Sequence, residues 1–327
     1  MYVESCAELS GQKKAAWERF LAVAALKPDA DSDQTVLIWD DGQIIACGSR
    51  KRNLLKCIAV DPGRQGEGLT AAVLTPLRQE AFSRGIKHLF LYTKPRNRML
   101  FTPLFFYPVA QTQNVLLMES ARGGIEQFLA GLDTPVRQGK IGCIVMNADP
   151  FTLGHRYLAE EAAKQCDWLY IFVLSEDRGF FRAADRMEMV RRGVAHLKNV
   201  TVHPTGDYLI SSATFPSYFL KESQSADKEH YALDLAVFTR WFVPRFGITH
   251  RFAGTEPNCR VTAGYNETMA QLLPEAGVEF VQVERRQNAG SAISASLVRK
   301  LIRQDEVSAI RDWVPESTYA YITEKDR

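Results

Sequence analysis

Apolar and polar positions follow two alternating periods over the C-terminal part of the chain. Short apolar runs predict buried strands at 141–145, 168–174, 200–203, 248–253 and 278–283. Between them, apolar residues at helical spacing predict helices at 182–197, 234–242, 262–272 and 294–303. Strands that alternate with helices are typical of a parallel sheet, in which ligands bind outside the carboxyl ends of the strands.

The N-terminal part of the chain has a mixed pattern. Two apolar runs at 36–39 and 43–47 flank Asp40-Asp41-Gly42, which is a strong hairpin signal. The segments that follow are a strand, a glycine-bearing loop, a helix and a second strand, at 53–60, 61–68, 69–84 and 88–93. This order predicts a mixed α/β domain.

The pattern changes between the two parts. Polar, glycine-bearing residues at 119–124 and turn residues at 131–135 flank a short helix at 125–132. We therefore predict two domains, at residues 1–132 and 133–327.

Composition narrows the class of protein without specifying a function. Hydrophobic residues make up 46% and charged residues 24% of the 327 positions, which is ordinary for a globular enzyme of two domains. The formal net charge of +2 argues against a nucleic-acid or membrane surface, and short basic groups such as 285–286 are expected to be solvated or to neighbour phosphates. The six cysteines lack metal-ligand spacing, and the N-terminus lacks a signal-peptide pattern. We therefore expect a cytoplasmic protein with no nucleic-acid partner, no membrane association and no protein metal site.

The junction at residues 141–155 has the clearest candidate chemistry. Its apolar run ends at Asn147, a polar turn follows, and a helical pattern begins after it. Thr152, Gly154 and His155 therefore fall at a helix N-terminus, where free backbone N–H groups and the helix dipole favour an anion. Gly154 allows a bound group to come close, and His155 adds a donor for a phosphate. The junction thus predicts a nucleotide site.

Two motifs resemble those of the nucleotidyltransferase superfamily. The spacing Asp149-Pro-x-Thr152-x-Gly154-His155 resembles its (H/T)xGH signature, and residues 293–299 resemble its ISSTxxR motif, with Ala295 at the second serine. A helix capped by Ser294 would bring three groups to a pyrophosphate, namely those of Ser294, Ser296 and Arg299. The resemblance implies a Rossmann-like parallel-sheet nucleotidyltransferase domain.

The N-terminal part resembles the acetyl-CoA-binding core of the GNAT acetyltransferases. Gln65-Gly66-Glu67-Gly68 matches the start of their Q/RxxGxG/A loop, whose N–H groups hold the pyrophosphate of coenzyme A, although the final position is Thr70. Phe105 stands where that fold commonly has a glycine. The resemblance implies an acyl-CoA-type domain in which Gln65, Gly66 and Gly68 bind a CoA-like group. The alternative for this loop is a plain turn before a helix.

A GNAT-like half followed by a nucleotidyltransferase half is similar to the citrate lyase ligase family. Residues 146–158 resemble the family's own first motif, and 175–181, 214–221 and 254–257 resemble further family blocks. The resemblance implies a ligase that forms acetyl-adenylate and pyrophosphate from acetate and ATP. The acetyl group then passes to the thiol of the dephospho-CoA-derived prosthetic group on the acyl carrier subunit of citrate lyase, AMP is released, and the lyase becomes active.

That reaction suggests a role for each candidate residue. His155 would donate to the α-phosphate, and Thr152 would hold a neighbouring phosphate oxygen. The β- and γ-phosphates would lie against Ser294, Ser296 and Arg299. Further binding positions follow strand ends, at Asn147, Arg178, Thr255 and Glu256. Mg²⁺ is expected to arrive with ATP, held mostly by phosphates and water. The alternatives are an ion pair with Glu176 or Asp177 for Arg178 and a plain turn position for Glu256.

Three other functions remain open at this point. The first is an adenylyltransferase that acts on a small phosphate such as phosphopantetheine or nicotinamide mononucleotide. The second is a non-enzymatic acyl-CoA sensor, against which the intact Thr152, Gly154, His155 and Arg299 argue. The third is an independent acetyltransferase in the N-terminal half.

Overall fold

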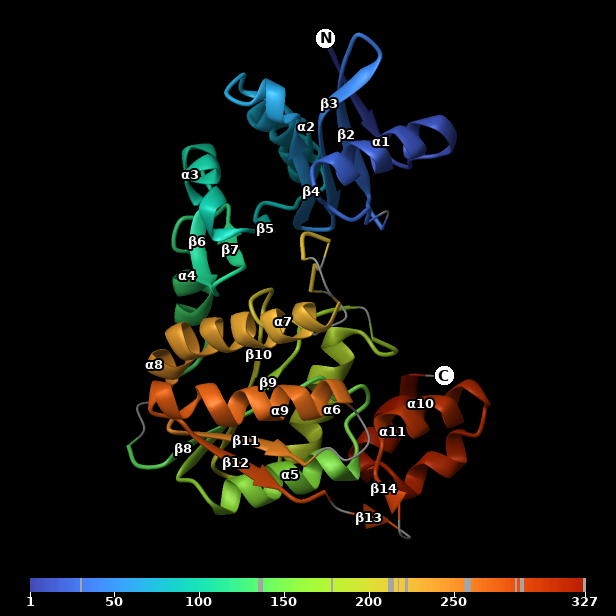
Figure 1. Cartoon of the computed structure of the whole chain (residues 1–327). Coiled ribbons are helices and arrows are strands. Elements are labelled where there is room, and N and C mark those ends of the chain that lie inside the picture. The colour runs from blue at the N-terminus through green and yellow to red at the C-terminus, as the bar shows by residue number, and fades with distance from the viewer. Residues whose placement is uncertain are drawn as a thin grey trace. The chain divides into compact units, whose positions relative to one another are not determined.

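The computed structural model describes residues 1–29, 31–134, 138–177, 179–210, 215–216, 218–220, 223–255, 260–285, 287–288 and 291–325. The chain forms two compact units, one built from residues 1–124 and 215–233 and the other from 125–214 and 234–327. Figure 1 labels the helices and strands of both units. The domain division between residues 132 and 133 stays a prediction.

The first unit contains a seven-stranded sheet in the order β1-β2-β3-β4-β5-β7-β6. Its strands are β1 (Tyr2–Cys6), β2 (Gln34–Asp40), β3 (Gln43–Lys51), β4 (Leu54–Val60), β5 (Phe90–Thr93), β6 (Tyr107–Gln111) and β7 (Leu116–Glu119). The predicted hairpin is β2 and β3, where Asp40 pairs with Gln43. β4 and β5 pair in parallel, whereas β2–β3, β3–β4 and β5–β7 are antiparallel, so the predicted mixed α/β domain is confirmed.

The helices of the first unit include α1 (Gly11–Val23), α2 (Leu69–Ser83) and α3 (Arg98–Phe101). α2 buries Leu69, Val73 and Leu77 in the apolar core that it shares with the strands. Gly68 is its N-cap with φ of +75°, a left-handed conformation that glycine adopts without strain. The glycine-rich loop thus passes directly into α2, as predicted.

The second unit contains a five-stranded parallel sheet in the order β10-β9-β8-β11-β12. Its strands are β8 (Ile141–Met146), β9 (Trp168–Val173), β10 (Val200–Pro204), β11 (His250–Gly254) and β12 (Glu279–Val283), and a small pair, β13 (Gln287–Asn288) and β14 (Ser291–Ala292), lies apart from it. All five predicted apolar runs are therefore strands, and the predicted parallel sheet is confirmed. β8 is central, between β9 and β11, at the point where the strand order reverses. Ligands bind at such points in open α/β sheets.

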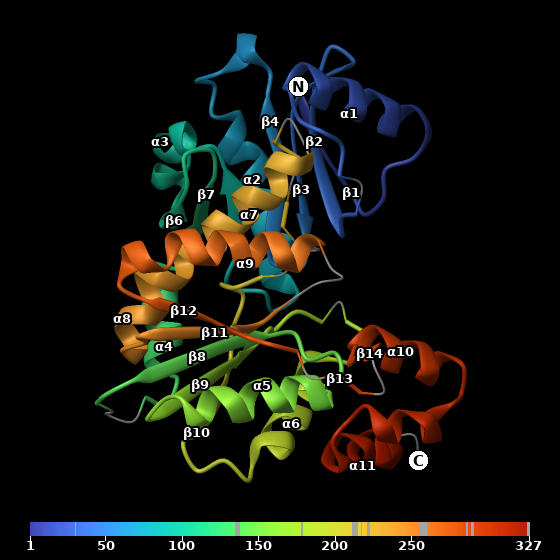
Figure 2. The ribbon, with the colours of Figure 1, turned by 60° about the horizontal axis from the view of Figure 1, so that its bottom comes forward.

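Helices cover both faces of this sheet. The helices of the remaining chain are α4 (Gly124–Ala130), α5 (Leu153–Lys164), α6 (Ala183–Val194), α7 (Ser223–Val237), α8 (Val243–Phe246), α9 (Arg260–Leu272), α10 (Ala295–Arg303) and α11 (Glu316–Lys325). Figure 2 shows α5 and α6 on one face of the sheet and α9 on the other. The helix predicted at 234–242 was wrong in its bounds, because α7 begins at Ser223 and Phe238–Phe242 form a π-helical segment.

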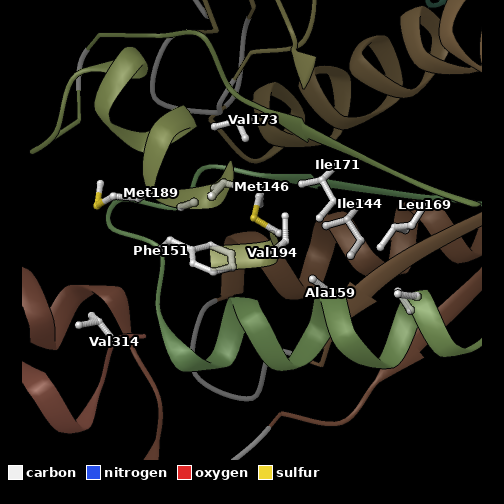
Figure 3. Packing of buried hydrophobic residues seen from close by; sticks show 14 of the residues in the cluster. Ile144, Met146, Phe151, Ala159, Leu169, Ile171, Val173, Met189, Val194 and Val314 are labelled. Atoms are coloured by element: carbon white, nitrogen blue, oxygen red, sulfur yellow. The ribbon is translucent and has the colours of Figure 1, made fainter. Parts of the chain in front are cut away.

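An apolar core between the sheet and α5 and α6 fixes the turn that leads into α5. Phe151, in this turn, is fully buried among sheet and helix residues that include Met146 and Val194 (Figure 3). A Cβ on Gly193 of α6 would overlap the Phe151 ring, so the glycine makes room for that ring. The packing therefore anchors the start of α5.

No helix in the described part of the chain has both the length and the apolar character that a membrane crossing requires. The cytoplasmic location stays a prediction.

Candidate functional site

The turn between β8 and α5 holds a threonine and a histidine against each other. Thr152 is the N-cap of α5, and its hydroxyl accepts a hydrogen bond from the N–H of His155 at 3.4 Å. In return, the N–H of Thr152 donates to Nδ1 of His155 at 3.1 Å, and the Thr152 hydroxyl lies 2.8 Å from the same nitrogen. This reciprocal arrangement is a capping box in which histidine replaces the usual Glu or Gln. It fixes the orientation of the imidazole.

The same contacts determine which ring nitrogen carries the proton. A backbone N–H can only donate, so Nδ1 of His155 is an acceptor and the proton of the neutral ring is on Nε2. Burial of the ring, reinforced by the charge of Arg285, lowers the pKa of His155 from 6.5 to about 4. Nε2 has no partner among the described residues. His155 therefore offers a neutral N–H donor at physiological pH.

A buried arginine organises the rest of the turn. Arg186 on α6 is fully buried, and it donates to the carbonyl oxygen of Asn147 at 2.8 Å and to its amide Oδ1 at 2.6 Å. It also donates to the carbonyl oxygens of Glu176 and Phe181. Burial lowers the pKa of Arg186, and nearby acidic groups oppose that shift. The amide oxygen of Asn147 is thus already engaged within the protein.

Asp149 joins the two sequence motifs. Its carboxylate accepts hydrogen bonds from the N–H groups of Phe180 and Phe181, both at 2.8 Å. Its carbonyl oxygen accepts one from Arg299, whose other nitrogen donates to Ser296 Oγ at 3.1 Å. Residues 150 positions apart in the chain therefore meet at the start of α5.

These groups surround a cavity of about 550 Å³ in the second unit. Its lining includes predicted residues from both motifs, namely Asn147, Thr152, Gly154, His155, Ser294 and Ser296. Ser294 caps α10 and accepts from the N–H of Ser296 at 3.2 Å, as predicted for a capped helix. The two motifs thus lie around one cavity large enough for a nucleotide.

Other predicted residues have different positions. The hydroxyl of Thr255 accepts from the N–H of Arg285, which lines the cavity, at 3.2 Å. Arg178 and Glu256 lie outside the described residues. The cavity is also lined by Arg251, Tyr265 and Asn266, which were not predicted from the sequence. The available signal was a charged residue, Arg251, inside an apolar strand run.

Gln65, Gly66 and Gly68 line a cavity of about 800 Å³ in the first unit. Tyr218 and Phe219 line it as well, and the buried hydroxyl of Tyr218 donates to the carbonyl oxygen of Tyr92 at 3.4 Å. Burial raises the pKa of Tyr218 well above its ordinary value. The predicted residues thus form two groups, one in each unit.

Comparison with known proteins identifies the family to which the chain belongs. A family model of the citrate lyase ligase C-terminal domain matches residues 141–322, and one of the acetyltransferase (GNAT) family matches residues 5–100. A citrate (pro-3S)-lyase ligase of Klebsiella pneumoniae is 42% identical over 316 residues, which is 95% of this chain and 92% of that protein. The chain belongs to the citrate lyase ligase family. A second ligase of this name, from Escherichia coli, is 39% identical over 95% of this chain and 90% of that protein.

Membership in the citrate lyase ligase family confirms the identification made from the motifs. The chain is an enzyme of the ligase class with a GNAT-like N-terminal part and a nucleotidyltransferase-like C-terminal part. Membership also supports ATP as a substrate. A phosphopantetheine adenylyltransferase of Corynebacterium efficiens is 29% identical over 147 residues, which is 41% of this chain and 91% of that protein. That similarity is confined to part of the chain.

Proposed function

We propose that this enzyme activates acetate with ATP and then acetylates the acyl carrier subunit of citrate lyase. The acceptor is the thiol of that subunit's dephospho-CoA-derived prosthetic group, and its acetylation activates the lyase. The observation that carries the proposal is the neutral Nε2–H of His155 in a cavity that both phosphate-binding motifs line. The relatives named as ligases of citrate lyase support the acceptor.

In the first step, a carboxylate oxygen of acetate attacks the α-phosphorus of ATP. The bond from this phosphorus to the bridging oxygen breaks, and pyrophosphate leaves with the electron pair. Acetate is already ionised at neutral pH, so the step needs positioning and charge stabilisation rather than a general base. His155 supplies a donor for the charge that develops on the α-phosphoryl oxygens.

The remaining candidates hold the nucleotide. Because Nδ1 of His155 is an acceptor, the Thr152 hydroxyl 2.8 Å away donates its proton to that nitrogen, and this proton would turn to a neighbouring phosphate oxygen when ATP binds. Gly154 lies in the first turn of α5, where a close approach to backbone N–H groups is possible. The β- and γ-phosphates would lie against Ser294, Ser296 and Arg299, and the nucleotide would also lie near Asn147, Arg178, Thr255 and Glu256.

Mg²⁺ would accompany ATP as part of the substrate. Glu284 is the acidic residue among the described residues that line the cavity. The described residues also contain no group of three or more His, Cys, Asp or Glu side chains suited to a metal ion. Phosphate oxygens and water would therefore supply most of its ligands, as Mg²⁺ commonly prefers.

In the second step, the carrier thiol attacks the carbonyl carbon of acetyl-adenylate. A thioester forms, AMP leaves, and the thiol proton is released. The cavity of the first unit, with Gln65, Gly66 and Gly68 in its lining, is our candidate for binding the prosthetic group. Its glycine-rich loop offers backbone N–H groups of the kind that bind a pyrophosphate.

Pyrophosphate release tests the proposal directly. The full chain is incubated with ATP and Mg²⁺, with and without acetate, before and after addition of thiol-form citrate lyase. We expect release that requires acetate and becomes catalytic with the lyase, because the carrier thiol clears the adenylate. Release that ignores acetate but requires phosphopantetheine or nicotinamide mononucleotide would instead establish an adenylyltransferase. Binding of acyl-CoA without ATP cleavage would favour a sensor, and acetyl-CoA turnover without ATP would favour an acetyltransferase.

A further inference from the structure

A buried arginine without a carboxylate partner lies in the cavity that contains His155. Arg251 is on β11, is 3% exposed, and lines that cavity. Its Nε has no hydrogen-bond partner, and its Nη1 donates to the weak acceptor Cys143 Sγ at 3.5 Å. Within the described ranges of the chain, no Asp or Glu side chain forms an ion pair with it. An unpaired buried cation is costly unless something compensates it.

The groups around Arg251 compensate its charge only in part. Its guanidinium lies 4.6 Å from the centroid of the Phe238 ring, which is a cation–π contact. The carboxylate of Asp234 accepts a hydrogen bond from the hydroxyl of Tyr265 at 2.5 Å. Burial and this carboxylate raise the pKa of Tyr265 well above its ordinary value, so Tyr265 stays a neutral phenol. A bound anion would supply the partner that Arg251 lacks.

The position of Arg251 favours a small carboxylate over a phosphate. Arg251 pairs in register with Cys143 on β8, so it lies deeper in the sheet than Asn147, which follows the end of that strand. The lining shared with Arg251 includes apolar residues, namely Val145, Ala253 and Met269. A planar guanidinium with parallel N–H donors matches a carboxylate, and an apolar wall suits a methyl group. The hydroxyls and the histidine that suit phosphates belong to the two motifs instead.

We propose that Arg251 binds the carboxylate of acetate and directs one of its oxygens toward the α-phosphorus of ATP. The methyl group then faces Val145, Ala253 and Met269. This inference rests on the proposed function. The oxygen that attacks becomes the bridging oxygen of acetyl-adenylate, the other remains the carbonyl oxygen, and no proton moves. Formation of the adenylate removes the negative charge that Arg251 holds.

The test separates the apparent KM for acetate from that for ATP. The full chain is assayed for pyrophosphate release, with hydroxylamine present to trap acetyl-adenylate so that the lyase is not needed. In Arg251→Met we expect the KM for acetate to rise about 10- to 100-fold, the scale of a lost charge-assisted hydrogen bond, with the KM for ATP unchanged. Arg285→Met provides the matched contrast, because Arg285 lines the same cavity and acts on His155. The Arg285→Met substitution should raise the KM for ATP more than the KM for acetate.

Arg251→Lys keeps the proposal testable if the methionine variant does not fold. Lysine keeps the charge but lacks the two parallel donors, so its KM for acetate should lie between those of the wild type and Arg251→Met. Equal changes in both KM values, or no change in either, would overturn the role of Arg251. A wild-type enzyme without acetate-dependent release would refute the proposed function itself, which is a different result.

Discussion

The proton on His155 is fixed by its neighbours rather than by the pH of the solution. The backbone N–H of Thr152 makes Nδ1 an acceptor, and burial lowers the pKa of the ring to about 4. A charged imidazolium would attract phosphates more strongly in the ground state. The hydrogen bond from a neutral donor strengthens most when charge develops on the α-phosphoryl oxygens. An interaction that is stronger in the transition state than in the ground state raises the rate of the reaction. The residue is therefore better suited to catalysis than to tight ATP binding.

Replacement of His155 tests this division between binding and catalysis. In His155→Ala we expect acetate-dependent pyrophosphate formation to fall by at least about 10²-fold, the scale of a lost charge-stabilising donor, while ATP still binds. Titration with ATP by calorimetry and the pyrophosphate assay measure the two effects. His196→Ala is the matched control, since His196 is exposed and pairs with Glu160 at 2.9 Å. Retained turnover in His155→Ala would remove His155 from the mechanism.

The pH dependence of stability is a second readout on the same variant. The unfolded chain protonates His155 near its ordinary pKa of 6.5, whereas the folded chain does so only near 4. Between these values the unfolded state binds the additional proton, so the free energy of unfolding falls as the pH is lowered from 6.5 to 4. His155→Ala should lose this part of the dependence. If the free energy of unfolding depends on pH in the same way in the variant and in the wild type, the ring of His155 is not buried and neutral.

At the scale of elements, α6 holds the turn between β8 and α5 from the side. Arg186 binds the carbonyl and amide oxygens of Asn147, and Gly193 leaves space for Phe151. Asp149 in the same turn receives backbone N–H groups from the segment just before α6. The polar groups of this turn are thus satisfied by α6, by the segment that precedes it and by Arg299 of α10.

Loss of Arg186 should therefore destabilise the fold. In Arg186→Met the acceptors on Asn147 and Glu176 lose their partner, and each hydrogen bond to a charged group contributes about 1.5–3 kcal/mol. We expect the free energy of unfolding to fall by about 3 kcal/mol or more, measured by urea denaturation of the full chain. Arg191→Met, at an exposed position of the same helix, should change it by less than about 0.5 kcal/mol. Similar free energies of unfolding for the two variants would show that the turn does not depend on Arg186.

Elements with strong periodicity could be predicted from the sequence, and weakly patterned ones could not. The five strands of the parallel sheet are apolar because helices cover both faces. By contrast, β1 exposes its apolar Tyr2 and Val3, and α1 buries only Trp17 and Leu21 among the residues described for it, so neither has a clear hydrophobic pattern. The start of α7 is polar, which explains why the prediction began it too late.

The candidate site was predictable where a local motif defines it. Thr152, Gly154, His155 and Ser294 follow from spacing at helix N-termini, a feature of the local chain. Arg186 resembles any basic residue of an amphipathic helix, and its burial depends on the fold of residues 147–176 against α6. Pocket residues that come from separate strands and helices, such as Tyr265, have no shared signal in the sequence. Long-range contacts of this kind require the structure.

At the scale of the whole molecule, the two units offer separate cavities for the two steps of the proposed reaction. The cavity of the second unit is lined by residues of both nucleotidyltransferase-like motifs, whereas that of the first is lined by a glycine-rich loop together with apolar and basic residues. Adenylate formation requires only ATP and acetate. Transfer also requires the prosthetic group of the carrier. A change in the first unit should consequently affect the second step alone.

The double variant Gln65→Ala/Gly68→Ala tests this separation. We expect slower acetylation of the carrier with unchanged acetohydroxamate formation in the presence of hydroxylamine, because hydroxylamine replaces the carrier as acceptor. Gly68 has φ of +75°, so alanine adds strain of about 1 kcal/mol besides removing a contact. Gly85→Ala controls for the strain, since Gly85 has φ of +79°, has open space around its Cβ position and does not line the cavity. If both steps slow equally in the double variant, the first unit supports the fold or couples the steps and does not bind the prosthetic group.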